Sequence, residues 1–83
     1  MKLVYFAWVR ERIGLESEEV TPPGSVHTTH ELIAWLKSRG PGYAIALAEP
    51  SAVRVAVDKV HASGDMPIAG AHEVAIFPPM TGG

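Results

Sequence analysis

Residues 73–79 read Glu73-Val74-Ala75-Ile76-Phe77-Pro78-Pro79, and this stretch decides the fold. Its first five residues are apolar on both alternating faces, which indicates a strand buried in the middle of a sheet. The two prolines predict the end of that strand, because proline has no N–H to donate to a neighbouring strand. A central strand is therefore expected directly before the last residues of the chain.

A second apolar run lies near the other end of the chain, where residues 3–9 read Leu-Val-Tyr-Phe-Ala-Trp-Val. Apolar side chains again occupy both alternating sets, so a strand buried on both faces is predicted. We expect it to form the central pair of the sheet with residues 73–77. Residues 10–14 are expected to be a short connector that Gly14 closes.

The intervening residues predict one main helix and three further strands. Residues 17–21 favour a polar edge strand. Thr28 and Glu31 fit a capping box at a helix start, and Gly40-Pro41 predicts the helix end, with Gly40 in the left-handed conformation. A second short helix is expected over residues 43–48.

Valines alternate in residues 53–57, and Asp58-Lys59 predicts a two-residue turn into a strand over residues 60–62. The resulting order predicts an α+β fold, a mixed sheet of about five strands with one main helix packed on one face. This pattern is the ubiquitin-like β-grasp. We expect a β-grasp domain over residues 1–77 and a flexible tail over residues 78–83.

Composition excludes several function classes. The chain has 83 residues, of which 47% are hydrophobic and 19% charged, with a net charge of −2 and no cysteine. One domain fits this length. The lack of cysteine excludes disulfide scaffolds, zinc ribbons and thiol nucleophiles. The basic residues are scattered, so no nucleic-acid partner is expected. His27 and His30 lack a third ligand, so no metal site is expected.

The first apolar run is also too short for a membrane segment. It has seven residues, whereas a transmembrane helix needs about 20. Charged residues follow it where a signal peptide would have its cleavage site. No membrane association and a cytoplasmic location are therefore expected.

The tail carries the chemistry. Pro78-Pro79 favours an extended backbone, and Met80 is an adaptable apolar anchor. Gly82-Gly83 places no side chain near the terminal carboxylate, so a narrow active site can close around it. A carboxylate is a poor electrophile and must be activated, normally as an acyl adenylate. The chain has no phosphate-binding loop, so an activating partner is implied.

The stretches 6–11 and 73–83 resemble the small subunits of molybdopterin synthase, above all in the ending Phe-Pro-Pro-Met-Thr-Gly-Gly. The resemblance implies a β-grasp sulfur carrier whose C-terminal Gly83 is adenylated and converted to a thiocarboxylate. Gly82 would be its flexible neighbour, and residues 78–81 (Pro78, Pro79, Met80 and Thr81) would thread into the large subunit. There the sulfur would pass to cyclic pyranopterin monophosphate, forming the dithiolene of molybdopterin.

The resemblance also implies the partners. They are the large synthase subunit in a heterotetramer, an adenylating enzyme related to ubiquitin-activating enzymes, and a sulfurtransferase system. ATP would be used by the adenylating enzyme, with no cofactor bound by this chain and no catalysis by it alone. Arg10 is expected to pair with an acidic partner residue, and Phe77 to serve as core or interface. Two alternatives stay open: a ubiquitin-like modifier joined to lysines, and a sulfur carrier for thiamine thiazole.

Overall fold

The computed structural model describes residues 1–79, so Met80, Thr81, Gly82 and Gly83 lie outside the described part. The elements are β1 (Lys2–Tyr5), α1 (Ala7–Ile13), β2 (Ser17–Glu19), α2 (Thr29–Lys37), α3 (Pro41–Ala46), the 3₁₀ turn η1 (Pro50–Ala52), β3 (Arg54–Val57), β4 (Val60–His61) and β5 (Glu73–Phe77). Within residues 1–79, no helix is long and apolar enough to cross a membrane.

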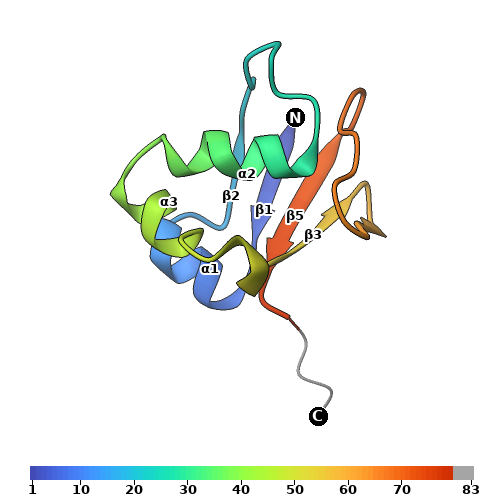
Figure 1. Ribbon diagram of the computed structural model, residues 1–83. Helices are drawn as coiled ribbons and strands as arrows, with labels where there is room; N and C mark the ends of the chain where they lie inside the picture. Colours follow the sequence, from blue (N-terminus) through green and yellow to red (C-terminus); the bar gives the residue numbers. More distant parts are fainter. Residues whose placement is uncertain (80–83) are drawn as a thin grey trace.

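The five strands form one mixed sheet in the order β2-β1-β5-β3-β4. β1 and β5 are parallel neighbours, and the other three pairings are antiparallel. Figure 1 shows α2 lying across one face of this sheet. The predicted β-grasp architecture and the predicted pairing of the two apolar terminal strands are therefore confirmed.

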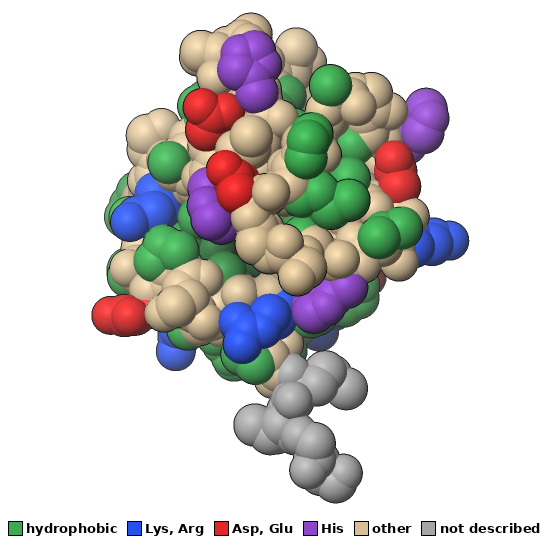
Figure 2. Space-filling view, turned by 45° about the vertical axis from the view of Figure 1, so that its right-hand side comes forward, with side chains coloured by type: hydrophobic (Ala, Val, Ile, Leu, Met, Phe, Trp, Pro, Cys, Tyr) green, Lys and Arg blue, Asp and Glu red, His purple; other side chains and the backbone are tan. Residues whose placement is uncertain are grey.

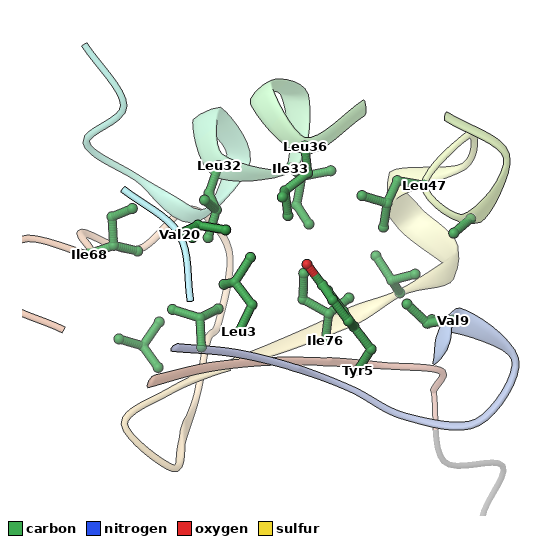
Figure 3. Packing of buried hydrophobic residues seen from close by; sticks show 14 residues of the cluster. Leu3, Tyr5, Val9, Val20, Leu32, Ile33, Leu36, Leu47, Ile68 and Ile76 are labelled. Carbon is green, nitrogen blue, oxygen red and sulfur yellow. The ribbon is translucent and has the colours of Figure 1, made fainter. Parts of the chain in front are cut away.

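The core lies between α2 and the sheet. Leu32 and Leu36 of α2 are fully buried, and Ile33 is 5% exposed. They face side chains that rise from β1 and β5, as Figure 3 shows for Leu3, Tyr5 and Ile76. All the core residues lie between positions 3 and 76. Within residues 1–79, the buried core is thus complete before the chain reaches Pro78.

The predicted strand over residues 3–9 is wrong in its second half. β1 ends at Tyr5, and residues 7–13 form α1. Ala7 has a φ of 53°, in the left-handed region, and this turn takes the chain out of the sheet. An apolar run alone does not separate a buried strand from a buried helix face. Gly14 ends α1 in the left-handed conformation, as predicted.

The main helix begins as predicted and ends differently. The side chain of Thr28 accepts a hydrogen bond from the Glu31 N–H, and Glu31 Oε1 accepts one from the His27 N–H at 2.8 Å. Gly40, however, has a φ of 162°, which is extended backbone, so the predicted left-handed cap is wrong. Gly40 caps the next helix instead, because Pro41 has the φ that the first helical turn requires.

The β3–β4 hairpin confirms the predicted turn. Asp58 and Lys59 have φ values of 47° and 70°, which suit a tight two-residue connection. Oδ1 of Asp58 also accepts hydrogen bonds from the N–H groups of His72 and Glu73, both at 2.9 Å. The turn thereby fixes the point at which β5 begins. β2, predicted over residues 17–21, is shorter and is an edge strand, as expected.

Glu18 is the centre of a polar cluster that ties β2 to the helical layer. Its Oε2 accepts hydrogen bonds from the hydroxyls of Tyr5 and Tyr43, each at 2.7 Å, and its Oε1 accepts one from Arg39 at 3.0 Å. Burial raises the pKa of Glu18, but these three donors outweigh burial and hold that pKa below its ordinary value. Burial and the bond to Glu18 raise the pKa of the Tyr5 hydroxyl.

We expect Glu18→Gln to lower the free energy of unfolding by about 1.5 kcal/mol at pH 7, because bonds to a charged acceptor are the stronger ones. The pKa of Glu18 is lower in the folded chain, so the stabilising contribution of its carboxylate is fully present above the ordinary pKa of the unfolded chain. That contribution is lost as the pH falls through the lowered, folded pKa. Urea unfolding over this acid range measures both effects.

Glu19→Gln is the matched control, because the Glu19 side chain is 77% exposed and, among residues 1–79, pairs only with the N-terminal amine at 3.4 Å. We expect it to change stability by less than about 0.5 kcal/mol. Equal losses of unfolding free energy in the two variants would contradict the stabilising role of Glu18. An unchanged dependence of stability on pH in the acid range for Glu18→Gln would contradict it as well.

Candidate functional site: the base of the C-terminal tail

An apolar cleft lies where β5 ends and α1 begins. It has a volume of about 380 Å³ and is lined by Phe6, Ala7, Ala75, Phe77, Pro78 and Pro79. We call it the tail cleft. Figure 1 shows β5 running toward the end of the sheet where α1 lies. The two prolines that lead into the tail therefore form part of the wall of this cleft.

The parallel pairing of β1 and β5 places Phe6 in the cleft. Tyr5 is in register with Ile76, and the N–H of Phe6 donates to the carbonyl of Ile76 at 3.1 Å. The turn at Ala7 then diverts the backbone into α1. The ring of Phe6 stays 46% exposed at the cleft, although it is large and apolar. An exposed aromatic ring beside a cleft is typical of a docking surface.

The sheet face opposite the core leads into the same cleft. Ala56 and Ala75 are opposite one another in the register, as are Arg54 and Phe77, and both pairs lie on the face away from Val74 and Ile76. The ring of His61 lies 5.8 Å from the ring of Phe77, tilted by 31°. The centre of this face is therefore apolar, and polar side chains border it near the tail.

The predicted site residues divide into three groups. Phe77, Pro78 and Pro79 are half-buried and line the tail cleft together. Arg10 is exposed on α1 and does not line it. Met80, Thr81, Gly82 and Gly83 lie outside the described residues, so their roles stay predictions.

The described part of the chain offers no metal centre. Within residues 1–79, no group of three or more His, Asp or Glu side chains is arranged to hold a metal ion. Nδ1 of His30 instead lies 3.7 Å from Asp65, which also accepts a hydrogen bond from the His30 N–H at 3.0 Å. The contact between His30 and Asp65 therefore connects the start of α2 to the loop before β5.

Sequence reasoning missed Phe6, Ala7 and Ala75 as site residues. Phe6 sits in the middle of the apolar run that predicted a continuous strand, so nothing marked it as exposed. The charged sequence Arg10-Glu11-Arg12 followed by Gly14 is the signal that points to an amphipathic helix there. Because the strand ends before that helix, Phe6 lies just beyond the C-terminal end of β1 and not inside the sheet.

Comparison with known proteins assigns the chain to a family. Residues 3–83 match the ThiS family. The chain belongs to the ThiS family. It is 35% identical to the molybdopterin synthase sulfur carrier subunit of Escherichia coli (strain K12), over 100% of this chain and 99% of that protein.

Two solved structures share the fold of this ThiS-family chain. The putative molybdopterin converting factor subunit 1 from Pyrococcus furiosus matches with a TM-score of 0.73 and 26% identity, covering 94% of each chain. SAMP1 from Haloferax volcanii matches with a TM-score of 0.67 and 26% identity, covering 100% of this chain and 98% of that one. Each match spans nearly the whole of both chains.

Proposed function

We propose that this chain is the sulfur carrier subunit of molybdopterin synthase. The observation that carries the proposal is the 35% identity to the Escherichia coli sulfur carrier subunit, which runs the full length of the chain and so includes the terminal Gly82-Gly83. The tail cleft supports it, because it offers a partner an apolar docking surface at the point where the tail leaves the sheet.

The chemistry falls on the terminal carboxylate of Gly83. A carboxylate oxygen attacks the α-phosphate of ATP in the activating enzyme, giving an acyl adenylate and releasing pyrophosphate. Hydrosulfide delivered by the sulfurtransferase system then displaces AMP and loses its proton, and the product is the thiocarboxylate. Inside the large subunit the thiocarboxylate sulfur bonds to cyclic pyranopterin monophosphate, and water then cleaves the acyl–sulfur bond, which returns Gly83 to a carboxylate. The chain binds no cofactor in this scheme and acts as the carrier, not as the catalyst.

The end of β5 suits this proposal. Phe77 ends the central strand, and Pro78-Pro79 cannot extend the sheet, so the described chain leaves the sheet directly before the proposed reactive residues. Apolar docking at Phe6 and Phe77 would hold the partner beside the tail. Arg10, exposed on α1, is available for an acidic residue of that partner.

Intact-mass spectrometry tests the proposal on protein purified from cells that contain the complete pathway. We expect a fraction of the chain to be heavier by one oxygen-to-sulfur exchange, and the large synthase subunit to co-purify. Co-purification with a thiazole-forming enzyme would support the thiamine alternative instead. A ladder of adducts between Gly83 and lysines on blots, without the sulfur form, would support the protein-modifier alternative.

A further inference from the structure

A second and larger hollow lies between α2 and β3, and its lining residues Arg54 and His61 neighbour Phe77 of the tail cleft. It has a volume of about 750 Å³, and η1 and the segment after β4 close its ends. Its lining residues are Thr29, His30, Ile33, Ala34, Lys37, Pro50, Ser51, Val53, Arg54, Val55, His61, Ala62, Ser63 and Gly64. We call it the α2–β3 groove. It shares no lining residue with the tail cleft.

The floor of the α2–β3 groove is apolar. Ile33 is 5% exposed and Val53 is 6% exposed, and the partly buried Val55 packs against the same core. Figure 1 shows that α2 lies over the middle of the sheet, so β3 extends beyond it. β4, the edge strand next to β3, has only two residues. The apolar inner side of β3 is therefore covered incompletely by the described residues.

The rim of the groove is cationic. Lys37 and Arg54 line it together with His30 and His61, and none of the lining residues is Asp or Glu. Figure 2 shows a recessed hydrophobic surface with basic and histidine side chains beside it and an acidic side chain at its upper border. The nearby Asp65 pairs with His30. The whole chain carries a net charge of −2, so the positive charge of this rim is opposite in sign to the charge of the chain as a whole.

The polar groups favour a peptide over a small molecule. Small-molecule sites orient their ligand with a few fixed polar groups. The buried hydroxyl of Thr29 is already engaged, because it accepts from the Met66 N–H at 3.1 Å and lies 3.4 Å from Asp65. The two cations at the rim are Lys37, on a long and adaptable side chain, and Arg54, whose Nη1 donates to the carbonyls of Ser51 at 3.0 Å and Val53 at 3.1 Å. A guanidinium has further N–H donors with which it can bind a carboxylate.

We propose that the α2–β3 groove docks an acidic segment of a partner protein, with one aliphatic side chain on the floor and carboxylates at Lys37 and Arg54. Charge complementarity to Lys37 and Arg54 carries this inference, because no Asp or Glu is among the lining residues and the nearby Asp65 is paired with His30. The groove shares no lining residue with the tail cleft, and its peptide test needs no step of the sulfur chemistry, so the two proposals are tested separately.

Amide NMR of the full chain tests the groove, with the blocked peptide Asp-Leu-Asp-Glu-Leu-Asp as probe. We expect saturable shift changes at Ala34, Lys37, Val55 and Ser63, and weaker binding in added salt. The neutral peptide Asn-Leu-Asn-Gln-Leu-Asn is expected to bind at least about tenfold more weakly, a difference of about 1.4 kcal/mol. Equal binding of the two peptides, or shifts confined to other surfaces, would overturn the proposal.

Two variants test whether the peptide binds at the α2–β3 groove. Lys37→Glu reverses a charge on the rim, and we expect it to weaken the acidic peptide about tenfold. Lys59→Glu makes the same charge change in the β3–β4 turn, outside the groove, and is expected to stay within about twofold. Identical losses in both variants would show general charge attraction and overturn the proposal. Binding of octanoate at the groove as tightly as the peptide would also overturn it, in favour of a small ligand.

Discussion

Removing Gly83 is expected to abolish molybdopterin formation while leaving the free energy of unfolding unchanged. The proposed chemistry takes place at the terminal carboxylate, and the deletion moves that carboxylate back by one residue, about 3.3 Å of extended chain. A displacement of this size is enough to misplace a reacting group in a closed active site. The buried core of the described residues, by contrast, lies between positions 3 and 76, so we expect the deletion to leave that core intact.

Molybdopterin formation is measured in a reconstituted reaction that contains the purified large subunit, the activating enzyme and a sulfur source. Urea unfolding measures the free energy of unfolding. Adding one alanine after Gly83 is a second test, because it hides the reacting carboxyl within a peptide bond and should also abolish activity. The matched control adds one alanine before Met1 and is expected to retain activity. A fully active Gly83 deletion would contradict the proposed function.

The last strand could be predicted from sequence because its signals are local. Residues 73–77 carry apolar side chains on both faces of a strand, and two prolines follow them. This pattern predicts a central strand that ends at Phe77, as observed. The turn at Asp58-Lys59 is equally local, since both residues adopt the positive φ that a tight hairpin requires.

The errors at Ala7 and Gly40 have a common physical cause. The strand β1 ends at Tyr5 because the left-handed turn at Ala7 directs the chain into α1, whose Val9 is fully buried in the core among residues distant in the chain. Gly40 is extended because α3 begins at once, with Pro41 in its first turn. An apolar run can form a strand or a helix face, and a glycine can be left-handed or extended, so contacts with the neighbouring elements decide between the two conformations.

The tail cleft was beyond sequence reasoning for a related reason. Its lining comes from opposite ends of the chain, and the register between β1 and β5 decides that Phe6 and Ala75 lie together. Composition around Gly83 suggests a reactive tail, whereas only the pairing of strands shows what lies at its base.

Phe6→Asp is expected to weaken binding of the large synthase subunit about 30-fold, which is about 2 kcal/mol, the loss typical of an aromatic residue at the centre of an interface. A carboxylate at this position would be buried without a partner in an apolar cleft once the subunits meet. The isolated chain should tolerate the change, because Phe6 is 46% exposed and is the N-cap of α1 without a side-chain cap. Aspartate is a favourable N-cap residue, so stability should stay equal or rise.

Calorimetric titration of the large subunit measures the affinity, and urea unfolding of the isolated chain separates it from folding. Leu15→Asp is the matched control, because Leu15 is 41% exposed, is also apolar and lies outside the tail cleft. It introduces the same charge, so any long-range repulsion of the partner appears in both variants. We expect Leu15→Asp to change the affinity less than about threefold. An equal loss in the two variants would show that the tail cleft is not the docking surface, since charge alone would then account for the effect of Phe6→Asp.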